Sequence, residues 1–208
     1  MINYDSFDWG NVTDDVFPFR HHLVDEIFNR KIYEAFFDVE EGDIVLDIGA
    51  SIGPFTYSIL DKKPKNIHCI EPVITEMLFN NTRSDSVKHH HFLIGDTDNE
   101  TTKTFKTFLA ENNIEKIDFL KTDCESGEYS IFNEENFEWI SKNVGKISGE
   151  WHLWGDEGKD RFRKFRDLYL SRFQHEVYSV DGVNIKWNLW TEEFIQYYTE
   201  VIVYIDNR

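Results

Sequence analysis

Residues 43–53 read Asp-Ile-Val-Leu-Asp-Ile-Gly-Ala-Ser-Ile-Gly, and the rest of the chain is best understood from this stretch. Its mainly apolar run, residues 44–48, is short and rich in β-branched side chains, which is typical of a buried parallel strand. Gly49 and Gly53 predict a tight turn after the strand. Pro54 suits the first turn of a helix, because a missing N–H costs nothing there. A strand, a glycine turn and a helix start together bring bare backbone close to a ligand.

The glycines and acids around this turn indicate the kind of ligand. A dinucleotide-binding turn has three glycines in the pattern G-x-G-x-x-G, whereas Ser51 stands between Gly49 and Gly53 here. Asp47 would repel a pyrophosphate but suits an ammonium group. Glu71 ends the next predicted strand, and an acid about 20 residues after such a turn can bind ribose hydroxyls. Either acid alone could be an ordinary turn or surface residue, but both in this order favour S-adenosylmethionine, which has an amino group, a sulfonium and a ribose.

Strand and helix patterns alternate along the chain. Short apolar runs predict strands at residues 44–48, 66–71, 88–94, 117–121, 144–150, 175–180 and 200–205. Helical spacing predicts helices at residues 21–36, from 54 onward, and at 75–80, 104–112, 129–140 with a break near Asn133, and 159–173. The turn signal Asp181-Gly182 allows an extra strand at 183–189. This alternation predicts an α/β fold with a mostly parallel sheet and antiparallel strands at its C-terminal end.

Length and composition limit the domain organisation. At 208 residues, with 40% hydrophobic and 16% aromatic residues, the chain is expected to fold around one core. Residues 1–19 are aromatic and acidic without a clear period, so we expect an N-terminal arm there that is docked on the surface. The remaining residues, 20–208, are expected to form a single domain.

Charge and cysteine content restrict the partners and the compartment. The net charge of −17 argues against nucleic acid and anionic membrane surfaces, because binding to either draws on Lys and Arg. No apolar run reaches the roughly 18 residues of a membrane span, and the N-terminus lacks the pattern of a secretory signal. Cys69 and Cys124 lie in or beside predicted strands and are interpreted as reduced thiols. These features predict a cytoplasmic protein with a small-molecule acceptor and leave the oligomeric state open.

A run of acids after the strand that ends at Lys121 carries the most specific signal. Asp123, Glu125 and Glu128 follow directly, and ligands of open α/β sheets bind outside the carboxyl ends of strands. For any one of them, the simpler interpretation is an acidic turn that caps the next helix, with Asp123 or Ser126 as the N-cap. Three together raise one another's pKa and require a cation, which Lys121, the sulfonium of a cofactor or a metal could supply.

These motifs, taken in order, resemble the FkbM family of class I S-adenosylmethionine-dependent methyltransferases. The resemblance runs from Val45 to His152 and is carried by residues 45–56, Glu71-Pro72, 118–128 and Glu150-Trp151-His152. The segment Lys-x-Asp-x-Glu-x-x-Glu after the fourth strand is the most diagnostic. The chain departs from the family where Ser126 replaces a glycine, and in the short segment before Asp118. The resemblance implies a Rossmann-like fold with a seven-stranded sheet, helices on both faces, and methyl transfer to an acceptor oxygen, commonly a hydroxyl of a sugar or natural product.

The resemblance also implies roles for individual residues. The methionine-binding loop matches Asp47, Gly49, Ala50, Ser51 and Gly53. The ribose-binding acid matches Glu71, followed by Pro72, and Asp96 is expected to approach the adenine amine. The acceptor side matches Asp123, Glu125, Glu128, Glu150 and His152, of which Asp123 is also expected to contact the cofactor.

Methyl transfer to an alcohol is an in-line displacement, and a positioned general base accelerates it by about 10²–10⁴-fold. His152 is the first candidate for this base by its ordinary pKa, although a histidine bonded to Glu150 or to a carbonyl is an equally good interpretation. Asp123 or Glu125 could be the base instead. A divalent cation held jointly by these acids and His152 is a weaker alternative, and no metal is expected. His89-His90-His91 alternate between the faces of a strand and cannot converge on one ion.

Two other classes of function stay open. An NAD-dependent oxidoreductase on a related sheet would bind a dinucleotide, but the missing middle glycine disfavours it. A catalytically inactive S-adenosylmethionine-binding protein would keep the pocket and lose the reaction. Ser126, at a position where the family usually has glycine, is the feature that suggests this possibility.

Overall fold

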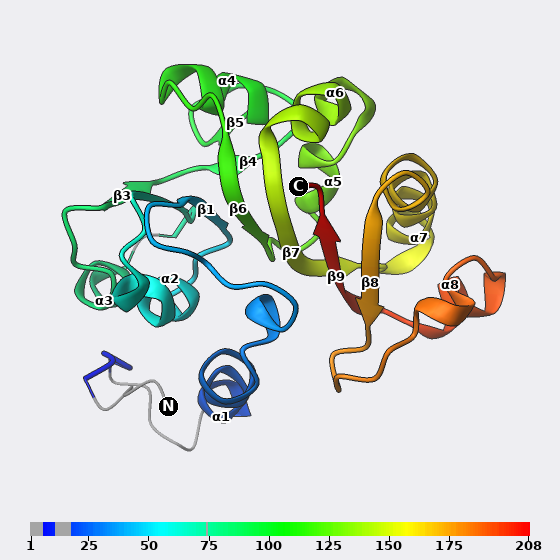
Figure 1. Ribbon diagram of the computed structural model, residues 1–208, viewed down its shortest axis with the longest axis horizontal. Helices are drawn as coiled ribbons and strands as arrows, with labels where there is room; N and C mark the ends of the chain where they lie inside the picture. The colour runs from blue at the N-terminus through cyan, green and yellow to red at the C-terminus, as the bar shows by residue number, and fades with distance from the viewer. Residues whose placement is uncertain (1–5, 11–17, 74) are drawn as a thin grey trace.

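In the computed structural model, which describes residues 6–10, 18–73 and 75–208, seven strands form one sheet through the middle of the molecule (Figure 1). The strands are β1 (Ile44–Ile48), β2 (Asn66–Ile70), β3 (Val87–His90), β6 (Ile117–Thr122), β7 (Val144–His152), β8 (Gln174–Tyr178) and β9 (Glu200–Asp206). Their order is β3-β2-β1-β6-β7-β9-β8. All neighbours pair in parallel except β9, which runs antiparallel to both β7 and β8. The predicted mostly parallel sheet with an antiparallel C-terminal strand is confirmed.

Side chains of β1 alternate between the two faces of the sheet. Leu46 and Ile48 pack into one hydrophobic core, and Val45 packs into a second core. All three side chains are fully or almost fully buried. A strand that is buried on both faces explains why residues 44–48 form a nearly continuous apolar run.

Helices cover both faces of the sheet. The core that contains Val45 is covered by the π-helical turn η2 (Val24–Arg30), α2 (Pro54–Ile59) and α3 (Glu76–Asn81). The core that contains Leu46 is covered by α4 (Phe105–Glu111), α5 (Glu128–Ile131), α6 (Glu134–Asn143), α7 (Gly155–Phe165) and α8 (Glu192–Tyr197). The gap between α5 and α6 includes Asn133, where a break is predicted from the sequence. Among the described helices, none combines the length and the apolar character of a membrane-spanning segment.

The third predicted strand is split in two. The sequence predicts one strand at 88–94, but β3 ends at His90, opposite the last residue of β2. The chain turns at Phe92, whose ring packs against those of His90 and Phe108. It then forms β4 (Leu93–Ile94), which pairs in parallel with β5 (Thr102–Lys103) in a separate two-stranded sheet. The split brings residues 92–95 to the end of the main sheet where β1 and β2 terminate.

The C-terminal segment also differs from the prediction. No strand forms at 183–189: this segment makes a single bridge between Tyr178 and Asn184 and then a short 3-10 turn, η6 (Lys186–Asn188). The helix α8 is not predicted by the sequence pattern. A start signal was present, because the hydroxyl oxygen of Thr191 accepts the N–H of Phe194 at 3.1 Å and caps the helix.

The predicted helix at 21–36 is interrupted, and the N-terminal residues pack beside it. It consists of α1 (Pro18–Leu23), η2 and η3 (Ile32–Glu34), with Lys31 in the left-handed conformation between the last two. Phe7 and Trp9 are buried against Phe28 of η2, as expected of a docked arm. Residues 1–5 and 11–17 lie outside the described residues, so the boundary between an arm and the domain stays a prediction.

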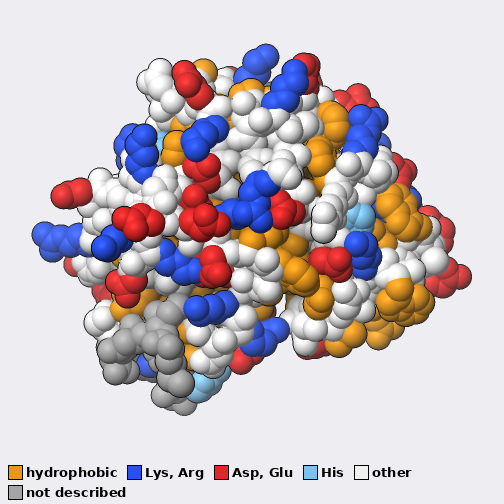
Figure 2. All heavy atoms as spheres, in the orientation of Figure 1, with side chains coloured by type: hydrophobic (Ala, Val, Ile, Leu, Met, Phe, Trp, Pro, Cys, Tyr) orange, Lys and Arg blue, Asp and Glu red, His pale blue; other side chains and the backbone are white. Residues whose placement is uncertain are grey.

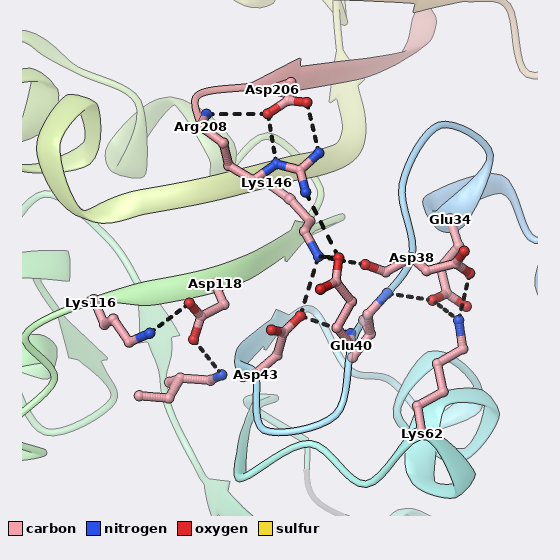
Figure 3. Close-up of polar contacts among 12 residues, drawn as sticks. Glu34, Asp38, Glu40, Asp43, Lys62, Lys116, Asp118, Lys146, Asp206 and Arg208 are labelled. Atoms are coloured by element: carbon pink, nitrogen blue, oxygen red, sulfur yellow. Dashed lines mark hydrogen bonds and ion pairs between the residues drawn. The ribbon is translucent and has the colours of Figure 1, made fainter.

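An ion-pair network fixes the segment that leads into β1 (Figure 3). The Nζ atom of Lys146 on β7 lies 2.7 Å from the carbonyl oxygen of Asp38, 2.9 Å from Oε1 of Glu40 and 3.4 Å from Oδ2 of Asp43. Lys146 is itself buried. Figure 2 shows acidic and basic side chains close together across this face of the molecule. The network ties the entry to β1 to a neighbouring part of the sheet, so the glycine turn follows a well-anchored strand.

Candidate functional site

A cavity of about 740 Å³ lies at the carboxyl ends of β1, β2 and β6. This volume falls within the range of about 300–1,000 Å³ that is typical of small-molecule sites. Its wall is formed by the residues that follow these three strands, by residues 92–95, and by Leu23, Glu26, Ile27 and Tyr33 of the N-terminal segment. The cavity occupies the position at which open α/β sheets bind their ligands.

The residues singled out from the sequence divide into two groups. Those that line the cavity are Gly49, Ala50, Ser51, Glu71, Pro72, Asp123 and Glu125. Those that lie outside its lining are Asp47, Gly53, Asp96, Glu128, Glu150 and His152. Asp96 is exposed, whereas its neighbour Gly95 lines the cavity. The turn after β1 and the acid after β2 therefore meet in one cavity, as their order in the sequence predicts.

The turn after β1 requires glycine because another segment passes very close to it. Gly49 has a φ of 78°, and a Cβ atom there would lie 1.7 Å from the carbonyl oxygen of Asp123. The N–H of Gly49 donates to the carbonyl oxygen of Ile70 at 2.9 Å. The turn is thus held between the ends of β2 and β6, and its backbone forms part of the cavity wall.

Glu71 is fixed at the edge of this turn. Its Oε2 atom accepts the N–H of Ser51 at 2.9 Å, and its Oε1 atom accepts the N–H of Val73 at 2.9 Å. Each carboxylate oxygen has a further lone pair, so the group can accept two more hydrogen bonds from a ligand. The carboxylate is oriented by the protein and open to the cavity.

Asp47 supports the turn from within the protein. Its side chain is fully buried; Oδ2 accepts the hydroxyl of Thr56 at 2.8 Å, and Oδ1 lies 3.1 Å from Nζ of Lys121. Lys121 also donates to the carbonyl oxygen of Gly49 at 2.7 Å and lines the cavity. Burial lowers the pKa of Lys121, but the charges of Asp47 and Asp123 outweigh this and raise it, so the pair is ionic. Asp47 therefore holds Lys121 in place, and Lys121 in turn fixes the carbonyl group of Gly49 in the turn.

Tyr33 and Glu26 also contribute to the cavity wall, although the sequence pattern does not single them out. Tyr33 is buried and donates its hydroxyl to Oδ2 of Asp123 at 2.8 Å. Glu26 is also buried and lies on η2 between Leu23 and Ile27, which both line the cavity. An acid at a helix position flanked by buried apolar residues was the available signal for Glu26. Tyr33 gave none, because an aromatic residue at such a position is normally part of the core.

His152 is held by Glu128 beside the cavity. Its Nδ1 atom lies 3.1 Å from Oε1 of Glu128, and the same oxygen accepts the His152 backbone N–H at 2.7 Å. Burial lowers the pKa of His152, but the hydrogen bond and the charges of Glu128, Glu150 and Asp123 raise it to about 9. The imidazole therefore already carries a proton at neutral pH, a state that does not suit a general base.

Glu150 has a pKa closer to neutral pH than His152 has. Its side chain is mostly buried, and its Oε1 atom lies 3.9 Å from Nε2 of His152. Burial and the charge of Asp123 raise the pKa of Glu150 to about 8, against the opposing effect of His152. Glu125 contrasts with it, since its side chain lines the cavity but is 73% exposed.

Within the part of the chain that the structure describes, no group of three or more His, Cys, Asp or Glu side chains is arranged to hold a metal ion. His89 and His90 of the histidine run have separate partners. Nε2 of His89 lies 2.7 Å from the hydroxyl of Thr82, and Nε2 of His90 lies 2.9 Å from Nδ1 of His68. The alternation of strand side chains separates the two rings, as predicted.

The strand order, the glycine turn and the acid after β2 define a Rossmann-like class I methyltransferase. A model of the Methyltransferase FkbM domain matches residues 42–179, and the chain belongs to this family. Membership implies an S-adenosylmethionine-dependent methyltransferase. A comparison with curated proteins found no significant match.

Solved structures of low sequence identity share the fold. A hemolysin candidate from Streptococcus thermophilus is 12% identical with a TM-score of 0.50, over 90% of this chain and 66% of that chain. An O-methyltransferase from Bacillus cereus in complex with SAH is 16% identical with a TM-score of 0.47, over 79% and 74%. A precorrin-6y C5,15-methyltransferase from Geobacter metallireducens is 11% identical with a TM-score of 0.49, over 88% and 89%. At such identities the likeness concerns the fold alone.

Proposed function

We propose that the protein transfers the methyl group of S-adenosylmethionine to a hydroxyl oxygen of a small acceptor, such as a sugar. One observation carries this proposal. Glu71 follows β2, lines the cavity, and is oriented by the N–H of Ser51 in the glycine turn. A carboxylate in this position suits the two hydroxyls of a ribose. Membership in the FkbM family supports the same cofactor.

The lining of the cavity supports the same cofactor. Gly49 leaves the backbone bare where the turn meets Asp123, so the wall there is free of a side chain. Pro72 and residues 92–94 form an apolar part of the wall, which suits an adenine ring. We assign the ribose to Glu71, the adenine to this apolar part, and the methionine moiety to the backbone of residues 49–51. Asp96 is exposed outside the lining, so Gly95 replaces it as the expected neighbour of the adenine.

The bound cofactor supplies a methyl group that is already activated by a sulfonium. The residues of the chain then have two tasks, which are to align the acceptor oxygen and to take up its proton. Asp123 and Glu125 line the cavity and are candidates for the proton acceptor. Glu150 is a third candidate, because it exchanges a proton near pH 8. His152, which is protonated below about pH 9, is assigned to positioning these carboxylates.

Charge and aromatic exposure support a neutral polyol as the acceptor. The cavity is lined by more acids than bases, namely Glu26, Glu71, Asp123 and Glu125 against Lys121 and Arg161. Both cations pair with acids outside the lining, Lys121 with Asp47 and Arg161 with Glu157, so the wall disfavours phosphate groups. Trp154 is 44% exposed and packs edge-on against the ring of His152 at 4.5 Å. An exposed indole beside carboxylates can pack on the face of a sugar while the acids accept its hydroxyls.

Binding and transfer experiments test the proposal. Calorimetry should detect S-adenosylmethionine binding and no comparable binding of NAD. Glu71→Ala should weaken S-adenosylmethionine binding by about tenfold or more, because a hydrogen bond to a charged group contributes about 1.5–3 kcal/mol. The control Glu76→Ala removes an exposed acid at the start of α3 and should leave binding unchanged. Tight NAD binding, or an unaffected Glu71→Ala, would reject the cofactor assignment.

The acceptor class is tested by transfer of labelled methyl groups. Neutral sugars, sugar phosphates and RNA are offered separately to the wild-type protein. Label in the neutral sugars supports the proposal. Label only in RNA or in phosphorylated sugars contradicts the acceptor assignment. Cofactor binding without transfer to any acceptor of a broad hydroxyl library favours the inactive binding protein instead.

A further inference from the structure

The hydroxyl of Tyr33 holds one of the carboxylates that line the cavity. It donates to Oδ2 of Asp123 at 2.8 Å and so joins η3 to the segment that follows β6. Both residues belong to the cavity lining. Burial raises the pKa of Tyr33 well above its ordinary value, and the charge of Asp123 raises it further, so the phenol keeps its proton and acts as the donor. The contact therefore fixes one oxygen of the Asp123 carboxylate.

The ring of Tyr33 is fixed by its own surroundings. Its side chain is buried and packs edge-on against Phe55, with ring centroids 5.8 Å apart. Nζ of Lys121 lies over the ring, 5.2 Å from its centroid. The hydroxyl of Tyr204 donates to the carbonyl oxygen of Ile32, which fixes the backbone just before Tyr33. The phenol therefore presents its hydroxyl from a well-defined position.

The backbone of Asp123 is anchored as well, and its second carboxylate oxygen is available. Its N–H donates to the carbonyl oxygen of Ile48 at 3.0 Å, and its carbonyl oxygen fills the space that a side chain at Gly49 would need. Among the described residues, the Asp123 side chain has no hydrogen bond or ion pair other than that with Tyr33. Oδ1 can therefore accept a hydrogen bond from a ligand.

The other two candidates for the proton acceptor are held less well. The Glu125 side chain is 73% exposed and lies 3.8 Å from Nε2 of His152. Glu150 lies outside the lining of the cavity, 3.9 Å from the same nitrogen. A general base must reach the acceptor hydroxyl in a defined orientation. Of the three, Asp123 combines a place in the lining with a buried donor that orients it.

We propose that Asp123 is the proton acceptor of the methyl transfer and that Tyr33 is its positioning residue. This inference rests on the proposed function. Oδ1 of Asp123 takes the proton of the acceptor hydroxyl as the hydroxyl oxygen bonds to the methyl carbon. The carbon–sulfur bond breaks with its electron pair going to sulfur, so a sulfonium and a carboxylate become a neutral thioether and a neutral carboxyl group. Tyr33 holds Oδ2 and thereby directs Oδ1 to the acceptor.

Kinetics of two tyrosine variants test the positioning role. Tyr33→Phe keeps the ring and removes the hydroxyl that Asp123 accepts. The matched control Tyr204→Phe also removes a buried hydroxyl, which is bonded to the backbone beside Tyr33 and not to Asp123. Transfer of labelled methyl groups is measured with the sugar that the wild-type protein methylates, and calorimetry measures S-adenosylmethionine binding.

Tyr33→Phe should lower kcat by about tenfold or more, because a misplaced reacting group slows the reaction steeply. Asp123→Asn should lower it by about 10²–10⁴-fold, the usual contribution of a general base. Both variants should keep the KM for the sugar and the affinity for S-adenosylmethionine, which also shows that they are folded. Tyr204→Phe should change neither kcat nor KM.

A second measurement needs neither cofactor nor acceptor. In protein labelled with ¹³C at Cζ of tyrosine, Asp123→Asn should shift the NMR signal that is lost in Tyr33→Phe and leave the signal that is lost in Tyr204→Phe. An unshifted Tyr33 signal, an unchanged kcat in Tyr33→Phe or Asp123→Asn, or an equal loss in Tyr204→Phe would overturn the inference. The proposed function would stand, because the wild-type protein still transfers the methyl group. Failure of the wild-type protein to methylate any hydroxyl would overturn both.

Discussion

The Nζ atom of Lys121 lies 3.1 Å from Oδ1 of Asp47, and both side chains are buried directly behind the glycine turn. The two residues are register partners on neighbouring strands, β6 and β1. Lys121 also holds the carbonyl oxygen of Gly49 at 2.7 Å. The carboxylate that the sequence assigns to an ammonium ligand thus has a cation inside the protein, and the pair sets the position of the turn.

Removing one partner of this pair should be much more harmful than removing both. Lys121→Met leaves Asp47 buried without its cation, and losses of about 3–5 kcal/mol are usual in such cases. The double variant Asp47→Asn/Lys121→Met removes both charges and should recover part of this loss. Urea unfolding measures each free energy. As a control, Lys116→Met disrupts an exposed pair with Asp118 and should have a much smaller effect. A double variant less stable than Lys121→Met would contradict the ionic-pair account.

A methyl group at Gly49 should disturb the site for a steric reason. Gly49→Ala would place Cβ 1.7 Å from the carbonyl oxygen of Asp123, so the segment after β6 must move. We expect a loss of stability of several kcal/mol and loss of cofactor binding. Gly42→Ala is the matched control, because Gly42 has a similar φ of 88° but no neighbour within 4 Å of such a Cβ. It should cost about 1 kcal/mol from backbone strain alone and should bind the cofactor normally. Similar behaviour of the two variants would contradict the steric explanation.

The central strand and the turn were predictable because local chemistry determines them. The run at 44–48 is buried on both faces, so its apolar pattern is unambiguous, and β1 begins and ends where predicted. The split of the strand at 88–94 was not predictable, since His90 and Phe92 both carry strand-like patterns and the break follows from the end of β2. The same applies to residues 183–189, where packing rather than the turn signal decides the backbone.

The candidate site was predictable in its position and less so in its chemistry. The order of Asp47 and Glu71 indicates a nucleoside ligand at the strand ends, and Glu71 lines the cavity. The sequence could not reveal that Asp47 is buried against Lys121, because this depends on strand register. It also could not reveal that Glu128 lies beside His152 and raises the pKa of its imidazole. Pairings between distant segments determine both features.

The raised pKa of His152 makes a testable contribution to stability. In the unfolded chain the ordinary pKa is near 6.5, whereas in the fold it is about 9. The folded state therefore holds the proton more tightly, and the stabilisation is complete below pH 6.5 and is lost as the pH rises through 9. Unfolding in urea should show that His152→Asn is less stable than the wild type by about 2 kcal/mol at pH 6. The difference should shrink at pH 9.5. The exposed His91→Gln serves as the control, and a difference that is constant with pH would refute this protonation state.

A histidine pair on the other side of the sheet should act in the opposite direction. His68 and His90 stack with ring centroids 5.1 Å apart, and Nδ1 of His68 lies 2.9 Å from Nε2 of His90. One nitrogen donates and the other accepts, so at least the accepting ring must be neutral. Burial, with a smaller contribution from neighbouring positive groups, lowers the pKa of both residues to about 4. The unfolded chain takes up these protons near pH 6.5, so the pair's contribution to stability is lost as the pH falls from 6.5 to 4.

The double variant His68→Leu/His90→Phe should flatten this acid-side loss. It removes both titrating rings together, so no buried polar atom of the pair is left without a partner. Urea unfolding at pH 7 and pH 4.5 measures the loss for each protein, because carboxylates contribute equally to both. We expect the wild type to lose about 2 kcal/mol more than the double variant between the two pH values. The variant His91→Gln should behave as the wild type does, since His91 is exposed and lies outside β3. Equal losses in the wild type and the double variant would contradict the prediction, because they would mean that the two histidines have the same pKa in the folded and the unfolded chain.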